Sequence, residues 1–361
     1  MGLWSCAAAV LAVWFTLIVM RSYDSTASTK GNFYAKATVD LRRSLNFALP
    51  KDEIRRLHRR RPGLHFAWVA WQFGLVGLSA WGLWTIANPL LWIPLAFVLG
   101  FTIFNFTVLL HEVVHDAVFD SRKSFWNRAL GYLYAFPSGI SATQFTRWHL
   151  DHHAELGHDE DDPKRFHLSP KINRRWYKLL YFTPVLFFIY FRAAARETAS
   201  YEPPLRRRIQ IERALTVLFQ LGVATALDLA GGFDVLLRVY LVPIFVVFPI
   251  AFVLNRLGQH YDIDPTDTAQ WSTLMKPSWF WDHAFLFSNY HLEHHYFPRV
   301  PFYNLPALHR ALRPFYEEHG MKARTYGQLL WNYLVLNRAP HTDWRAGGPR
   351  PASTAPGAAG G

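Results

Sequence analysis

Long apolar runs alternate with strongly charged segments along this chain. Residues 66–86 contain no charged side chain, and residues 90–110 form a second uncharged run just after Asn88-Pro89. A run of about 20 apolar residues is long enough to cross a hydrocarbon layer of about 30 Å as an α-helix. Because Asn-Pro favours a tight turn, the two runs predict a helical hairpin whose second leg ends directly before His111.

Two later runs, residues 214–230 and about 239–257, predict a second hairpin. The first is shorter and carries Asp228 near its end, whereas the second contains Pro243 and Pro249, which are expected to kink a helix. The pattern as a whole predicts an all-α integral membrane bundle of four main transmembrane helices. Both return legs end on the same side, where we expect a helical cap outside the membrane.

Two other apolar segments do not fit this scheme. Residues 179–191 make only 13 positions and include Pro184, so they predict an interfacial or re-entrant helix. Residues 3–20 are apolar enough to insert and are followed by Arg21. We interpret them as an extra anchor with its N-terminus outside, or as the product of an upstream translation start, because a cleaved signal peptide would place the later basic cluster on the wrong side.

These boundaries divide the chain into three parts. Residues 1–44 form an N-terminal apolar segment and linker, residues 45–335 a membrane domain, and residues 336–361 a C-terminal tail. Within that tail, residues 345–361 are rich in Gly, Ala and Pro. Such a composition cannot bury a core, so the tail is expected to be disordered.

Basic residues predict the orientation of the bundle. The connections at 87–89 and 231–237 contain no Lys or Arg. Basic residues instead precede the first and third runs: Lys51, Arg55, Arg56, Arg59, Arg60 and Arg61, then Arg206, Arg207, Arg208 and Arg213. Because positive loops stay on the cytoplasmic side, these flanks and the helical cap are expected to be cytosolic.

Composition narrows the classes of protein. Hydrophobic residues make up 51% of the chain and aromatic residues 17%, yet 18% are charged. The formal charge of +12 suits contact with anionic membrane lipids or an acidic protein partner, and the apolar runs argue against a nucleic-acid partner. Cys6 is the one cysteine, which excludes an internal disulfide and a Cys-rich zinc or iron–sulfur site, so imidazole remains as the metal ligand.

Eight of the 17 histidines lie in three short clusters. Residues at i, i+3 and i+4 of a helix share one face, so the two H-x-x-H-H clusters can each direct three imidazoles to one region. Neutral imidazole suits iron, copper, zinc or nickel, and so many ligands exceed the needs of one ion, which predicts two metals. The clusters are His111 and His115; His149, His152 and His153; and His291, His294 and His295.

Four carboxylates stand beside the clustered histidines: Glu112, Asp116, Asp151 and Glu293. A carboxylate can accept the second ring N–H of a ligating histidine and fix its tautomer, and we expect that role here. The alternative is that these acids only neutralise a basic patch.

In these residues the chain resembles the membrane-bound fatty acid desaturase superfamily, whose three histidine boxes run H-x(3 or 4)-H, H-x-x-H-H and H-x-x-H-H. All three occur in order. The second is followed by Asp162-Pro163, and the third lies between Asn289-Tyr290 and Phe297-Pro298. The resemblance covers roughly residues 45–335.

The resemblance implies two Fe ions bound by histidines on the cytosolic side, with dioxygen as co-substrate for removing hydrogen from a lipid or acyl chain. It also implies two electrons from a separate donor, a ferredoxin or cytochrome b-type protein, since no fused haem domain is visible. Related enzymes supply another histidine from the end of the last span, a place that His260 occupies. Some place an asparagine four residues earlier to hold a metal-bound water, whereas here position 256 is Arg and Asn255 lies five back.

The leading hypothesis is a fatty acyl desaturase with those nine histidines as iron ligands. A hydroxylase or ketolase acting on a carotenoid or sphingolipid is the nearest alternative, because hydroxylation differs only in oxygen rebound after the same hydrogen abstraction. The third hypothesis is a non-redox membrane zinc protein, either a receptor-like hydrolase or a metal transporter. Transport would require polar ligands inside the spans, yet the clusters fall at or beyond the ends of the apolar runs.

Overall fold

The computed structural model describes residues 30–119 and 124–342, and this part of the chain is helical without a β-strand. Its one β-bridge joins Met275 to Arg324. The all-α class predicted from the sequence is therefore confirmed. Residues 3–20, the expected anchor, lie outside the described residues, as do residues 343–361 of the predicted tail.

The first predicted hairpin consists of α5 (Pro62–Thr85) and α6 (Pro89–Val114). The Asn88 side chain accepts a hydrogen bond from the Leu90 amide and caps α6, whose first residue is a proline. The apolar part of α6 is 61% buried inside the protein, against 28% for α5. Helix α6 is therefore the central element, and it continues past residue 110 to carry His111 in its last turn.

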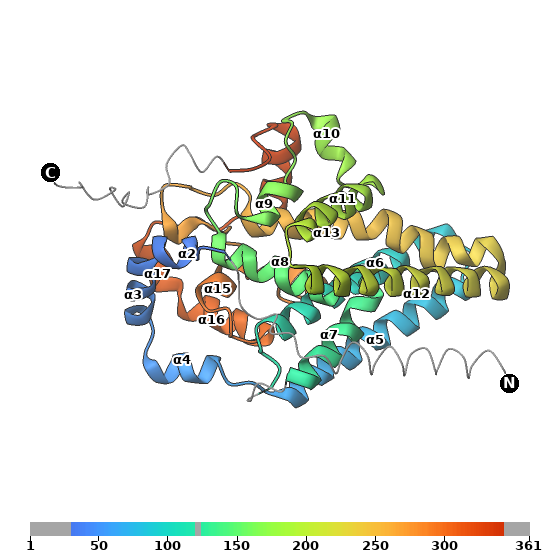
Figure 1. Ribbon diagram of the computed structural model, residues 1–361, viewed down its shortest axis with the longest axis horizontal. Helices are drawn as coiled ribbons and strands as arrows, with labels where there is room; N and C mark the ends of the chain where they lie inside the picture. Colours follow the sequence, from blue (N-terminus) through green and yellow to red (C-terminus); the bar gives the residue numbers. More distant parts are fainter. Residues whose placement is uncertain (1–29, 120–123, 343–361) are drawn as a thin grey trace.

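The third long apolar helix is a single helical run, Pro203–His260, made of α12 (Pro203–Leu236), the π-helix η1 (Leu237–Val247) and α13 (Phe248–His260). It is not straight, because Gly232 has φ 74° and ψ 178°. The Tyr240 hydroxyl donates a 2.8 Å hydrogen bond to Gln220, although 20 residues of straight helix would span about 30 Å. The run therefore folds back on itself as two legs, as Figure 1 shows.

This second hairpin differs from its prediction in two details. Helix α12 begins at Pro203 rather than near residue 214, so its basic residues lie within the helix and not before it. The kink expected from the prolines takes the form of η1, where the backbone around Pro243 is wound as a π-helix. Proline cannot donate the normal helical hydrogen bond, which favours this local rewinding.

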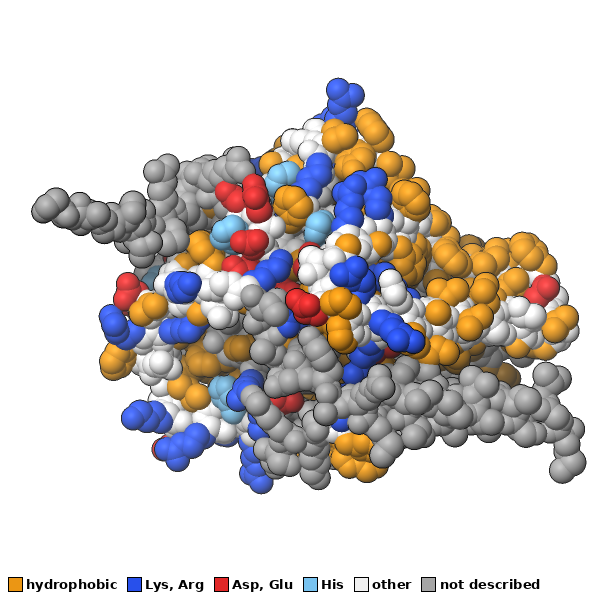
Figure 2. All heavy atoms as spheres, in the orientation of Figure 1, with side chains coloured by type: hydrophobic (Ala, Val, Ile, Leu, Met, Phe, Trp, Pro, Cys, Tyr) orange, Lys and Arg blue, Asp and Glu red, His pale blue; other side chains and the backbone are white. Residues whose placement is uncertain are grey.

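By length and composition, three helices of the described chain could cross a membrane: Pro62–Thr85, Pro89–Val114 and Pro203–His260. In Figure 2 the right-hand end, formed by these helices, presents mostly hydrophobic side chains. Lys and Arg gather over the other half of the visible face. Hydrophobic and basic side chains thus occupy different parts of this surface.

Shorter helices surround the histidine-bearing ends of the long helices (Figure 1). The boundary predicted after residue 44 falls inside one of them, and the segment predicted at 179–191 is broken between two, at residues 181–184. The short helices are α2 (Phe33–Ala37), α3 (Val39–Ala48), α4 (Lys51–Leu57), α7 (Ser124–Ser138), α8 (Ala142–Glu155), α9 (Pro163–Leu168), α10 (Arg175–Leu180), α11 (Val185–Ala199), η2 (Thr268–Gln270), α14 (Trp279–Ala284), α15 (His291–Tyr296), η3 (Phe302–Asn304), α16 (Leu305–Ala311), α17 (Arg313–Glu318), α18 (Tyr326–Leu330) and η4 (Trp331–Val335).

Residues 336–342, the start of the predicted tail, are placed against the helices. The guanidinium of Arg338 donates a hydrogen bond to the Asp262 carboxylate. The backbone carbonyl of Arg338 accepts a hydrogen bond from the ammonium group of Lys178, whose side chain is buried. The Thr342 carbonyl accepts from Arg165. This stretch therefore belongs to the packed structure.

The contact between α6 and η1 depends on Gly100. A Cβ atom at this position would lie 2.5 Å from Val247 Cβ and 2.7 Å from the Pro243 carbonyl oxygen. We predict that Gly100→Ala lowers the thermal midpoint of the detergent-solubilised protein, at a cost of about 1–3 kcal/mol for overpacking. Gly77→Ala in α5, where a Cβ meets nothing within 4 Å, is the control. Equal midpoints for the two variants would contradict this packing.

Candidate metal centre

The nine histidines predicted as ligands all converge, and they do so in two groups. Within each group, one ring nitrogen from every member lies within 4.8 Å of the others. The five-histidine group comprises His111, His115, His149, His153 and His294; the four-histidine group comprises His152, His260, His291 and His295. Two clusters of imidazole nitrogens match the two metals predicted from the number of histidines.

The H-x-x-H-H spacing divides each cluster between the two groups. On α8, the i and i+4 residues His149 and His153 join the five-histidine group, and His152 joins the other. On α15 the division is reversed, because only His294 joins the five-histidine group. Each short helix therefore holds both groups at once, so the two sites share one rigid frame.

Hydrogen bonds at the outer ring nitrogens indicate which way the inner nitrogens face. His152 Nδ1 lies 2.8 Å from Asp162 Oδ1, and His260 Nδ1 lies 3.0 Å from the Trp271 carbonyl oxygen. A carbonyl oxygen only accepts, so Nδ1 of His260 carries the proton and its Nε2 presents a lone pair.

The Nε2 atoms of His152 and His260 are 3.0 Å apart. If the Asp162 carboxylate accepts the Nδ1 proton of His152, both Nε2 atoms are acceptors, and two acceptors at this distance need a cation between them. Among the described residues, the buried Nε2 of His111 likewise has no hydrogen-bond partner. The donor set thus fits metal ions bound through Nε2.

Burial keeps these imidazoles neutral. Desolvation lowers the pKa of His152 to about 4, although the Asp162 carboxylate partly opposes the shift. It also lowers the pKa values of His149, His153, His291, His294 and His295 well below the usual range. Neutral imidazole is the form that ligates metals, so the rings are ready for binding at neutral pH.

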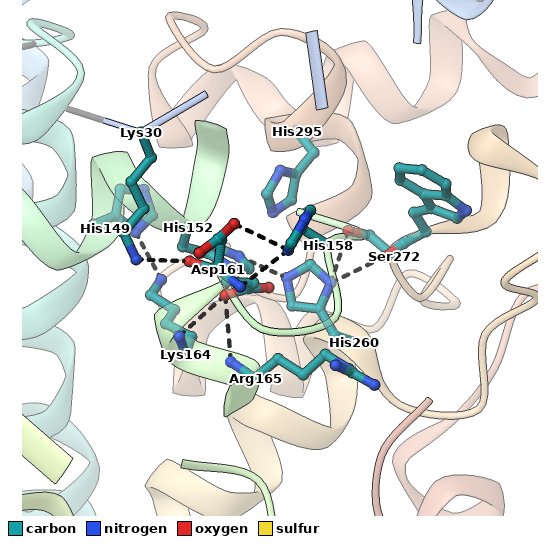
Figure 3. A network of polar contacts seen from close by, with 12 residues as sticks. Lys30, His149, His152, His158, Asp161, Lys164, Arg165, His260, Ser272 and His295 are labelled. Carbon is teal, nitrogen blue, oxygen red and sulfur yellow. Dashed lines mark hydrogen bonds and ion pairs between the residues drawn. The ribbon is translucent and has the colours of Figure 1, made fainter. Parts of the chain in front are cut away.

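Lys164 contacts the outer nitrogen of His149, with Nζ 2.7 Å from Nδ1 (Figure 3). Burial, together with the charge of Arg256, lowers the pKa of Lys164 to about 7. A neutral amine can accept the Nδ1 proton and leave the His149 Nε2 lone pair free for a metal. A charged ammonium would donate to Nδ1 instead and force the ring proton onto Nε2.

Asp162 and Lys164 were not predicted as site residues. A signal for Asp162 was present, since Asp before Pro is typical of a helix start, and its carboxylate does cap α9 through the Lys164 and Arg165 amides. That carboxylate also contacts His152, which lies ten positions earlier. No periodic pattern indicated Lys164, because its role depends on α9 packing against α8.

The four predicted carboxylates lie near the histidines, with varied partners. Glu112 Oε1 is 3.7 Å from His111 Nδ1, and its other oxygen accepts from the Phe302 amide. Glu293 accepts from His309 and from the Tyr316 hydroxyl. Asp116 accepts from Asn127, and Asp151 from Arg147. Their predicted role in orienting ligand rings stays a prediction.

A cavity opens beside both histidine groups, and its walls include His111, His149, His291 and His294. Most of its exposed lining is apolar, with walls formed by Phe104, Phe145, Phe187, Tyr190, Phe248 and Phe252. Its polar lining includes Lys164, Asn255, Arg256, Gln259 and Ser288. We call this space the main cavity. It could hold a long apolar chain next to the metal-binding nitrogens.

The fold and site define a class: over its described residues the protein is all-helical, with long apolar helices and two adjoining all-histidine groups that could hold metal ions. The fatty acid desaturase family model matches residues 87–327, more than half of the sequence. The chain belongs to the fatty acid desaturase family.

Similar proteins include two human enzymes. The chain is 28% identical to the sphingolipid delta(4)-desaturase/C4-monooxygenase DES2 over 244 residues, which cover 64% of this chain and 68% of the relative. It is 27% identical to the sphingolipid delta(4)-desaturase DES1, covering 77% and 82%. A putative sphingolipid delta(4)-desaturase/C4-monooxygenase of Caenorhabditis elegans is 26% identical, covering 63% and 60%.

The division of ligands predicts how metal content responds to mutation. His291→Ala removes one of four nitrogens from its group and none from the other. We expect two irons per chain in the wild type and about one in the variant, because losing a ligand weakens a metal site strongly. Elemental analysis of the purified protein measures this, with the exposed His319→Ala as control. A single zinc in the wild type would instead favour the non-redox alternative.

Proposed function

We propose that this protein is a multi-pass membrane desaturase that inserts a double bond into a lipid acyl chain. Two Fe ions would be held by the nine histidines, and dioxygen would be the co-substrate. The observation that carries the proposal is that two all-histidine groups adjoin a largely apolar cavity, which is lined by His111, His149 and His294 of one group and His291 of the other. A saturated chain offers no polar handle, so its position must be set by the shape of the cavity walls.

When bound, the irons supply the activation of dioxygen and the removal of hydrogen from an unactivated carbon. The chain's own residues provide the setting. The aromatic walls of the main cavity would keep water away from the bound acyl chain. Asp162, the Trp271 carbonyl and Lys164 would hold the Nδ1 protons of His152, His260 and His149, so that each Nε2 faces a metal.

We further propose that each leg of the two hairpins crosses the membrane, giving four spans. Residues 45–335 then form the membrane domain, and the histidine-bearing short helices form a cytosolic cap. The support is the reversal at Gly232 and the positive flanks, which favour the cytoplasm.

A second candidate is hydroxylation of a sphingolipid. Two of the similar proteins carry both desaturase and C4-monooxygenase in their names, and all three are named for sphingolipids. The same histidine groups would serve either outcome. The substrate of this chain is therefore proposed as an acyl lipid, with a sphingolipid as the alternative.

Lipid extracts of an expressing host separate these outcomes. We predict a product lighter than its precursor by two mass units; a gain of one oxygen would indicate the hydroxylase. His294→Ala, which removes a ligand from the five-histidine group, is expected to reduce product at least about 100-fold while the protein still inserts. His319→Ala should retain activity. Wild-type product from His294→Ala would refute the assignment.

The electron donor is proposed to be a separate acidic protein, a ferredoxin or cytochrome b-type carrier. Exposed Arg55, Arg59 and Arg61 lie on or just after α4 and could steer it. We predict that kcat/KM for the donor falls severalfold as salt rises, because the Debye length shrinks from about 30 Å at 0.01 M to about 3 Å at 1 M. The double variant Arg55→Glu with Arg59→Glu should flatten this dependence. A flat wild-type profile would count against the basic surface.

A further inference from the structure

Arg256 brings a positive charge into the wall of the main cavity without a matching acceptor. It lies on α13, one helical turn before His260, and its side chain lines the main cavity. Among the described residues, no hydrogen bond or ion pair engages its guanidinium. It also lines a smaller cavity shared with His152, Asp162 and His260.

The acids nearby are already occupied. Asp162 interacts electrostatically with Arg256, but its carboxylate accepts hydrogen bonds from the Lys164 and Arg165 amides and contacts His152. Of the described acidic residues, Glu112 alone lines the main cavity, and its carboxylate accepts a hydrogen bond from the Phe302 amide. The charge of Arg256 is therefore not balanced by an ion pair within the cavity.

The neutral polar groups around Arg256 are also engaged with one another. The Asn255 amide nitrogen donates to Ser288 Oγ, and its oxygen accepts from Gln259. Lys164 is committed to His149. Among the described residues, the planar N–H fork of Arg256 is therefore left without an acceptor from the protein.

A guanidinium in a low-dielectric cavity is costly unless an anion or water satisfies it. Its fork matches carboxylate and phosphate oxygens, which it can bind through two parallel hydrogen bonds. The same cavity is walled largely by aromatic side chains, and one of them, Phe252, lies one turn before Arg256 on α13. A cation in a largely apolar cavity is complementary to an amphiphile with an anionic head.

We propose that Arg256 binds the anionic head group, a carboxylate or phosphate monoester, of a long-chain substrate whose hydrocarbon lies along the main cavity. This inference rests on the proposed function and names its substrate class. Because Arg256 is one turn from His260, the carbons presented to the metals lie nearer the head group than the methyl end. The selected substrate is charged at its head, whichever acyl lipid it is.

Binding to the iron-loaded protein, kept free of dioxygen and of an electron donor in a neutral detergent, tests the site without turnover. The probes are palmitate, hexadecyl phosphate and hexadecanol, which share a 16-carbon chain, and titration calorimetry gives each Kd. We expect at least one anionic probe to bind about tenfold or more tightly than the alcohol, as for charge-assisted hydrogen bonds. The better of the two anions identifies carboxylate or phosphate as the preferred head.

Three variants make the test specific. Arg256→Met should abolish the anion preference while the affinity for hexadecanol changes by less than about twofold. Arg256→Lys keeps the charge but loses the fork, so it should retain a reduced preference and serves if the Met variant does not fold. Arg313→Met, at an exposed helix position, should behave as wild type.

Equal affinity of the wild type for alcohol and anions would overturn the proposal, as would an anion preference that survives in Arg256→Met. The iron-loaded enzyme is then assayed separately. If anion binding depends on Arg256 but no unsaturated or hydroxylated product forms, the proposed function fails, whereas the anion site remains as a binding site.

Discussion

The structure depends on bringing nine imidazole lone pairs close together in a buried space. Neutral imidazoles whose Nε2 atoms face one another repel unless a cation lies between them, and several such contacts are about 3.0 Å. The surrounding helices hold the imidazole rings at these short distances. Helix α6 and α13 carry His111 and His260 at their ends, while α8 and α15 each contribute three rings. The proposed metal binding would therefore be coupled to the folding of this region.

Two hairpins explain why ligands from distant parts of the sequence meet. Each hairpin turns at one end, near Asn88 or at Gly232, so both return legs finish at the other end. The close approach of α6 to η1 at Gly100 aligns these legs. The short helices then complete the site over the ends of the legs, and the main cavity lies against α6, α8, α11 and α13.

Much of this arrangement could be predicted because it has a local signature. Uncharged runs indicated the first hairpin, and the i, i+3, i+4 spacing indicated which residues share a helix face. The spacing could not indicate that His152 joins His260 while His149 joins His111, because that division depends on how α8 is rotated against α13 and α6. The start of α12 was misjudged because its basic first turns are polar yet helical. Lys164 and Arg256 escaped notice as site residues because lone cations have no pattern until the helices are packed.

The central claim is that two metals lie in two adjoining groups of five and four histidines. Anomalous diffraction from crystals of the iron-loaded protein, recorded at the iron absorption edge, tests it most directly. The account predicts two peaks, one among the Nε2 atoms of His115, His149 and His153 and the other among those of His152, His260 and His291. A single peak, or a peak outside these groups, would contradict it.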